Sequence, residues 1–153
     1  MTDAALTACA GFLLAVLWMD LMFDSQVRSQ ERALGEPTLA SIAGYYHRVT
    51  TASRPRSALI AAVMAALLAL LVIEAATGDS PAWLLMLSAV LAGGPILLAL
   101  LRTVPNAVRL GARADDHGEQ SRLAWTIYRD HLLCLGGLSA FMALRLTSVF
   151  LGL

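Results

Sequence analysis

The chain has 153 residues, of which 58% are hydrophobic and only 14% are charged. Soluble domains average about 45–50% apolar and about 25% charged residues, so this composition excludes an ordinary soluble domain. It also excludes a disordered chain, which needs low hydrophobicity, and a disulfide scaffold, because there are only two cysteines. The formal net charge is zero, so we expect no nucleic-acid partner. The composition predicts a polytopic membrane protein.

Four stretches reach the roughly 20 apolar residues that a transmembrane helix needs. The first contains only the charge of Asp20, the second only Glu74 and the fourth only Arg145, while the third contains no charge. We therefore expect an all-α protein with a single domain over residues 1–153, in which four transmembrane helices form an antiparallel bundle. The predicted spans cover about residues 4–23, 58–76, 81–101 and 132–153. No basic segment precedes the first span, so we expect a retained helix and not a signal peptide.

The basic residues predict the orientation in the membrane. All 11 are arginines, and ten of them lie in the two long segments that join spans one to two and three to four. Because positive residues concentrate in cytoplasmic loops, both long loops should be cytoplasmic and both termini should lie outside. The absence of lysine, together with many alanines and leucines, is typical of GC-rich bacterial genomes. We therefore expect a multi-pass protein of the bacterial inner membrane, in contact with the lipid bilayer.

Each long loop carries the pattern of a short amphipathic helix. In the first loop, Pro37 can open a helix whose apolar residues recur at helical spacing as far as Val49. In the second loop, Ser121 can cap a helix that passes through Trp125 and Tyr128 into the last span.

Small residues along the spans predict close helix packing. Two rows in the second span recur every four residues: Ala58, Ala62 and Ala66, and Ala61, Ala65 and Ala69. In the third span, Gly93-Gly94-Pro95 predicts either a tolerated kink or a break that lines a cavity.

Two charged residues should lie at similar depth in the outer half of the membrane. Counted along a helix at 1.5 Å per residue, Glu74 and Arg145 fall at comparable distances from the cytoplasmic side. We predict that they form a structural ion pair between spans two and four. The alternatives are an arginine that snorkels to the surface and a transport site built on the two charges.

A second polar group is predicted near the cytoplasmic end of the bundle. Carboxylates and imidazoles that converge in a water-poor site can act as general acids and bases. The candidate catalytic residues are Asp20, Asp24, His47, Asn106 and His131. His47 and His131 could instead bind a metal or a heme, although no HxxxH, CxxC or ExxH spacing indicates a metal site, or they could simply lie in headgroup water. The sequence leaves the cofactor unknown.

One segment, Leu100–Leu138, resembles a known family. The residues that carry the resemblance are Val104-Pro105-Asn106, then after a basic loop Trp125, Arg129 and His131. They are similar to the small four-span family that includes the anthrone oxygenases. The resemblance implies a cofactor-independent oxygenase acting on lipophilic polycyclic anthrones, in a family whose bacterial members mostly have no assigned role.

Besides transport through a site at Glu74 and Arg145, two functions fit these patterns. We place first an accessory or structural subunit of a larger membrane complex, with other membrane subunits or further copies of the chain as partners. The small-residue faces, the absence of a firm catalytic motif and the minimal regions outside the membrane favour it. The alternative is a membrane enzyme or a binder for a lipophilic small molecule, which would use the Asp, His and Asn cluster.

Overall fold

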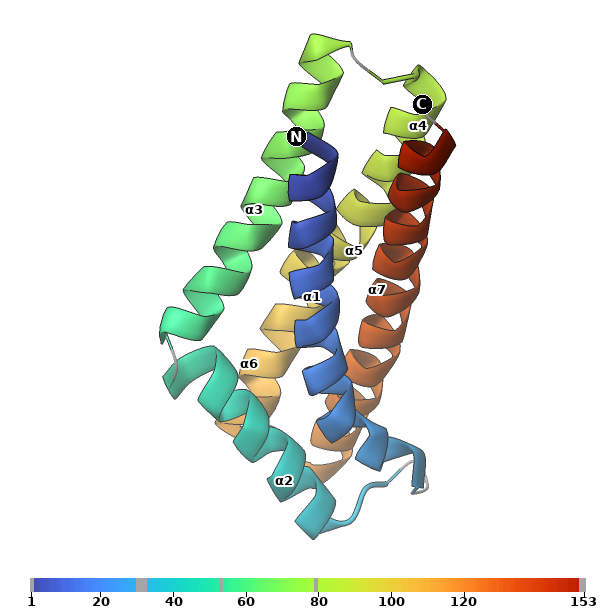
Figure 1. Ribbon diagram of the computed structural model, residues 1–153. Coiled ribbons are helices and arrows are strands. Elements are labelled where there is room, and N and C mark those ends of the chain that lie inside the picture. Colours follow the sequence, from blue (N-terminus) through green and yellow to red (C-terminus); the bar gives the residue numbers. More distant parts are fainter. Residues whose placement is uncertain (1, 30–32, 53, 79, 152–153) are drawn as a thin grey trace.

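The computed structural model describes residues 2–29, 33–52, 54–78 and 80–151 (Figure 1). Within these ranges the chain is helical and contains no β-strand. Among the same residues, four helical segments are long and apolar enough to cross a membrane: Thr2–Arg28, Pro55–Thr77, Ala82–Ala112 and His117–Leu151. The predicted all-α, four-span architecture is confirmed. Gly152 and Leu153, which the prediction includes in the last span, lie outside the described residues.

The helices follow one another along the chain as follows. The first span is α1 (Thr2–Asp24), extended by a 3₁₀ turn (Ser25–Ser29). α2 (Glu36–Tyr46) and a π-helical turn (His47–Ala52) lead to the second span, α3 (Arg54–Thr77). The third span consists of α4 (Ala82–Ser88), α5 (Gly94–Leu98) and α6 (Val104–Ala112), joined by π-helical turns at Ala89–Gly93 and Ala99–Thr103. The fourth span is α7 (His117–Leu151).

The spans alternate in direction, so the two termini lie at the same end of the bundle as the α3–α4 connection (Figure 1). We call this end the terminal end. α2 lies across the opposite end, which we call the α2 end. α1 runs beside α3 and α7, and it contacts both along much of its length. One face of α1 makes these contacts, while Trp18 and Met22 on another face stay exposed. The polar residues Asp20 and Asp24 lie near the α2 end.

The start of α7 differs from the prediction. The helix begins at His117, and Oδ1 of Asp116 accepts a hydrogen bond of 2.9 Å from the backbone N–H of Glu119, so Asp116 is the capping residue. Ser121 lies one turn inside the helix, where its hydroxyl donates to the carbonyl of His117 (2.9 Å) and accepts from the backbone N–H of Leu34 (3.2 Å). The prediction was wrong because Asp116 offers the same capping chemistry earlier in the chain.

α2 forms as predicted, with Pro37 in its first turn, where a missing N–H leaves no partner unsatisfied. Its apolar side chains are buried in a cluster with residues of α6 and α7, including Leu110 and Ile127. The approach of α6 is close, because a Cβ added at Gly111 would lie 2.8 Å from the backbone nitrogen of His47. α2 therefore covers the end of the bundle and closes it.

The third span is irregular without being broken. Gly93 and Gly94 keep helical backbone angles, with φ of −67° and −57°. Pro95 lacks an N–H, and the π-helical turns on both sides of α5 absorb the irregularity. On the facing helix, a Cβ added at Gly137 would lie 2.6 Å from Cγ of Pro95 and 3.1 Å from the carbonyl oxygen of Leu91. Gly137 is therefore the small residue that lets α7 approach this part of the third span.

The alanine rows of the second span do not pack inside the bundle. All six alanines are exposed, although Ala61 also borders a cavity. α3 instead turns Met64, Leu67, Leu71 and Glu74 toward α1 and its neighbours. The prediction that these rows bring the spans of one chain together was wrong, because larger apolar side chains on the other face of α3 make those contacts.

Candidate functional site

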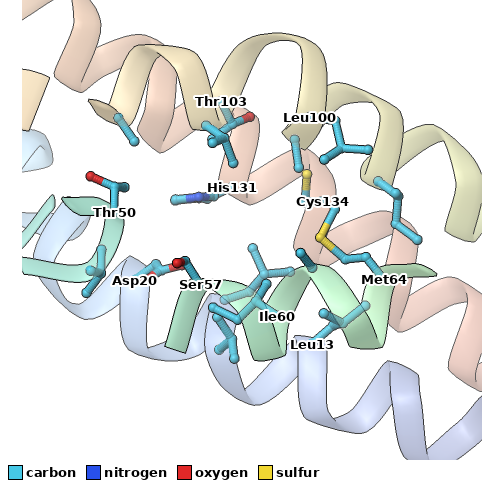
Figure 2. A pocket seen from close by; sticks show the side chains of 18 of the residues that line it. Leu13, Asp20, Thr50, Ser57, Ile60, Met64, Leu100, Thr103, His131 and Cys134 are labelled. Carbon is cyan, nitrogen blue, oxygen red and sulfur yellow. The ribbon is translucent and has the colours of Figure 1, made fainter. Parts of the chain in front are cut away.

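A cavity of about 370 Å³ lies inside the bundle toward the α2 end (Figure 2). Its walls come from α1, α3, α7, the turn after α2 and the third span. Most of the lining is apolar and includes Leu13, Leu17, Ile60, Met64, Ile96, Ala99, Val104 and Leu138. Cavities of this size and character are typical of sites that bind small lipophilic molecules.

The polar groups of the cavity are concentrated at its α2 end. They belong to Asp20, Tyr46, Thr50, Arg56, Ser57, Thr103 and His131. Farther from this end, successive turns of α1 and α7 contribute Leu13 and Leu138. The cavity therefore has a polar end and an apolar end, and Figure 2 shows this separation along its length.

His131 is held by a buried carboxylate. Oδ2 of Asp24 lies 2.6 Å from Nδ1 of the imidazole, and Asp24 is 0% exposed. The hydroxyl of Tyr46 donates to the other carboxylate oxygen at 2.6 Å. A carboxylate beside Nδ1 favours the tautomer that carries its proton there, which leaves the lone pair of Nε2 free to accept a proton. Figure 2 shows the ring projecting into the cavity between Asp20 and Thr103.

Asp20 is a second carboxylate, one helical turn from Asp24, and it lines the cavity directly. Its Oδ1 accepts a hydrogen bond of 2.5 Å from the hydroxyl of Tyr45. Nη2 of Arg56 donates to the same hydroxyl at 3.1 Å and lies 3.9 Å from Oδ1 of Asp20. The adjacent residues Tyr45 and Tyr46 thus bind two different carboxylates.

Burial raises the pKa of both tyrosine hydroxyls above its ordinary value. The carboxylate of Asp20 raises the pKa of Tyr45 further, and those of Asp24 and Asp20 raise the pKa of Tyr46 further. Both phenols therefore remain protonated hydrogen-bond donors at physiological pH. Neither tyrosine is among the site residues that the sequence analysis predicts. The signal that could have found them is their position on the buried face of α2.

The predicted cluster is brought together only in part. Asp24 and His131 are in contact and Asp20 lies beside them at the cavity. His47 is exposed, and Asn106 is half-buried; neither lines the cavity. The structure therefore does not bring His47 and Asn106 to the cavity with the other three residues. His47 follows the two tyrosines directly, so its side chain leaves the helix in another direction.

Asp130, next to His131, fixes the wall of the cavity. It is fully buried and accepts two hydrogen bonds from Arg102, from Nη2 at 2.6 Å and from Nε at 3.0 Å. The hydroxyl of Thr103 also donates to it, at 3.2 Å. These bonds join the second π-helical turn of the third span to α7. The sequence analysis missed this role of Asp130.

Near the terminal end, the side chains of Glu74 and Arg145 lie within ion-pair distance, as the sequence predicts. Nη2 of Arg145 is 2.9 Å from Oε1 of Glu74, and the arginine is 1% exposed, so it does not snorkel to the surface. The same nitrogen contacts Asp3, and Ser80 donates to Glu74. The sequence analysis did not include Asp3. A packed apolar layer that contains Leu6, Leu67 and Phe141 separates this group from the cavity.

Among the described residues, no set of three or more His, Cys, Asp or Glu side chains is placed to hold a metal ion.

No protein-family model, curated protein or solved structure matches the chain. The resemblance to the anthrone oxygenases therefore stays a prediction, and the geometry of the site carries the functional argument.

Proposed function

We propose that this multi-pass membrane protein binds a lipophilic small molecule in the cavity and uses His131 as a general base toward it. The observation that carries the proposal is the contact of 2.6 Å between Asp24 and His131, with the imidazole directed into an apolar cavity. A histidine that only stabilised the bundle would have no need to face such a space. We therefore favour a membrane enzyme or binder for a lipophilic molecule over the accessory subunit that the sequence analysis places first.

The proposed step is a proton transfer. Nε2 of His131 takes the proton of a hydroxyl or of an acidic C–H group, and the electron pair of the broken bond stays on the bound molecule as an anion. The carboxylate of Asp24 stabilises the imidazolium that forms. The proton then returns to the product or leaves to water. The oxygenation implied by the family resemblance would begin with the same anion, with dioxygen as the oxidant.

The test compares two histidine variants in protein purified with its native lipids. Bound small molecules are extracted and identified by mass spectrometry, and their turnover by the protein is measured. His131→Gln should lose the bound molecule or its turnover, whereas His47→Gln, an exposed histidine outside the cavity, should keep both. Equal occupancy and equal turnover in wild type and His131→Gln would contradict the proposal.

The second candidate function is a subunit of a larger membrane assembly. It is favoured by the exposed alanines of α3, since small residues allow a helix of another subunit or of a second copy to approach closely. Replacing Ala62 and Ala66 by leucine should then dissociate the assembly, while Ala143→Leu, on the exposed surface of α7, should not. Native mass spectrometry from nanodiscs measures the difference. A monomeric wild type with no co-purifying protein counts against this candidate.

We further propose that the protein lies in a bacterial inner membrane with its α2 end in the cytoplasm and both termini outside. The proposal rests on the positive-inside rule, since the arginines of both long loops belong to this end. Single cysteines at Asp115 and Thr77, in a chain without Cys9 and Cys134, test it with a membrane-impermeant thiol reagent. Intact cells should be labelled at position 77 only, and labelling at position 115 instead would reverse the orientation.

A further inference from the structure

We infer that the occupant of the cavity is an amphiphile with an uncharged, hydrogen-bonding head and an alkyl or isoprenoid chain, and that it enters from the bilayer between α3 and the third span. This inference rests on the proposed function and adds the class of ligand and its route.

The separation of polar and apolar lining sets the orientation of the ligand. The head would lie at the α2 end, where His131, Asp20 and Thr103 border the cavity. The chain would lie against Leu13 and Met64, toward the middle of the bundle. A ligand that is polar throughout would leave the apolar part without a partner, and a pure hydrocarbon would leave buried polar groups unsatisfied.

The charges that reach the cavity favour a neutral head. Arg56 lies 3.9 Å from Asp20, so these two lining charges largely compensate each other. His131 presents an uncharged nitrogen when Nδ1 carries the proton. An anionic head would meet the carboxylate of Asp20, which lines the cavity, and a cationic head would have to displace Arg56 from Asp20. A hydroxyl can instead donate to Nε2 of His131 without disturbing either pair.

The walls of the cavity indicate where the ligand enters. At the α2 end, Tyr46 lines the cavity and is only 3% exposed, as part of the apolar cluster that seats α2 on α6 and α7. On the side, the lining residues Leu100, Val104 and Val108 of the third span are 50%, 47% and 43% exposed. They are exposed on the helical segment Ala82–Ala112, which is long and apolar enough to cross a membrane, and Ala61 on α3 is exposed as well. α3 contacts the third span through α4 and the π-helical turn Ala89–Gly93, which belong to the half of the span toward the terminal end.

A lateral opening also removes the limit that the cavity places on ligand length. The head and the first part of a chain fill the cavity of about 370 Å³, and the remainder extends between the helices into the bilayer. A chain-bearing molecule therefore never has to leave the hydrocarbon phase to reach His131.

The experiment uses three photoreactive probes with the same diazirine-bearing alkyl chain and different heads: an alcohol, a carboxylate and a trimethylammonium group. Each probe is added to the full-length protein in nanodiscs, and crosslinked peptides are mapped by mass spectrometry. The alcohol should crosslink residues that line the cavity about tenfold more than either charged probe, which corresponds to one unit in the logarithm of the binding constant. Equal yields from the three heads, preference for a charged head, or no cavity crosslink from any probe would overturn the inference.

Two sets of variants test the charge argument and the route. Asp20→Asn leaves the charge of Arg56 uncompensated, so the crosslinking yield of the carboxylate probe should rise relative to that of the alcohol probe. Val104→Trp places a bulky ring at the opening and should reduce crosslinking by the alcohol several-fold, while Val149→Trp, exposed near the terminal end, should leave it unchanged. Val108→Phe repeats the obstruction at a second exposed position. Unchanged crosslinking in both obstructed variants would overturn lateral entry.

The outcomes separate this inference from the proposed function. If His131→Gln abolishes turnover of the native ligand but the alcohol probe does not bind, the role of His131 as a base is supported and the proposed ligand class is wrong. If the alcohol probe occupies the cavity but His131→Gln changes no turnover, the ligand class is supported and the proposed role of His131 is wrong.

Discussion

Asp24 and His131 are separated by 107 positions in the chain, yet Oδ2 of the carboxylate lies 2.6 Å from Nδ1 of the imidazole. The contact joins the first helix to the last at the polar end of the cavity. The hydroxyl of Tyr46, from the helix that covers the bundle end, completes the group. Three segments distant in sequence thus determine which nitrogen of His131 faces the cavity.

Replacing Asp24 by asparagine should reverse the tautomer of His131. The amide of asparagine can donate to Nδ1, so the proton would move to Nε2 and the ring would lose its basic atom at the cavity. Turnover should fall about 10²–10⁴-fold, which is the usual contribution of a general base. Nitrogen chemical shifts of ¹⁵N-labelled histidine measure the tautomer independently of any activity.

The matched control is Asp115→Asn, at the α6–α7 connection, where the carboxylate pairs with Arg109 at 2.9 Å. It should change neither the tautomer nor the turnover. Retention of an unprotonated Nε2 in Asp24→Asn would show that another group sets the tautomer.

The sequence could predict the four spans, because long apolar runs are a local property that bilayer thickness dictates. It could also identify the few charged residues inside these apolar runs, namely Asp20, Glu74 and Arg145. It could not predict which partner each carboxylate binds, because Asp20 and Asp24 are chemically identical side chains that lie one helical turn apart. Their division depends on how α2 is seated, with Tyr45 bound to one carboxylate and Tyr46 to the other.

The helix ends and packing faces were harder to predict for a related reason. Hydropathy does not detect helix in polar stretches, yet α7 starts at His117, where Asp116 caps its first turn. Alanines spaced four apart predict close packing without saying which helix they face. Only the tertiary structure shows that Gly137 lies close to the third span and that the alanines of α3 are exposed.

Gly137 and its neighbour Gly136 form a natural comparison. Gly137→Ala should destabilise the bundle by about 1–3 kcal/mol, the usual cost of overpacking, because the new Cβ meets Pro95 at 2.6 Å. At Gly136 nothing lies within 4 Å of an added Cβ, so Gly136→Ala should stabilise the helix by about 0.5–1 kcal/mol. Thermal unfolding in detergent measures both. Equal effects of the two substitutions would contradict the close contact between α7 and the third span.

The ion pair near the terminal end should behave as a coupled unit. Arg145→Leu should destabilise the protein by about 3–5 kcal/mol, because the buried carboxylate of Glu74 loses its charged partner. The double variant with Glu74→Leu should recover most of this loss. Nε and Nη1 of Arg145 and Oε2 of Glu74 have no hydrogen-bond partner among the described residues, so removing both side chains also removes unsatisfied groups. Additive losses in the double-mutant cycle would show that the two residues act independently.

The tyrosines of α2 should make stability fall at alkaline pH. Burial raises the pKa of Tyr45 and Tyr46 in the folded protein, whereas in the unfolded chain they ionise near their ordinary pKa of about 10. The folded state therefore holds these protons more tightly. The contribution of these tyrosines to the free energy of unfolding is fully present below about pH 10 and is lost as the pH rises toward their pKa in the folded protein. The chain contains no lysine, so no lysine titration overlaps this window.

Tyr46→Phe isolates the contribution of one of these hydroxyls. At neutral pH the variant should be about 1.5–3 kcal/mol less stable, because Asp24 loses a hydrogen bond to its charged oxygen. Above about pH 10 the difference from wild type should shrink, since only wild type has this phenol to ionise on unfolding. Melting temperatures across the alkaline range measure the difference, and Tyr128→Phe, whose ring contacts Trp125, serves as the comparison. A difference between Tyr46→Phe and wild type that stays constant with pH would mean that the phenol ionises equally in the folded and unfolded states.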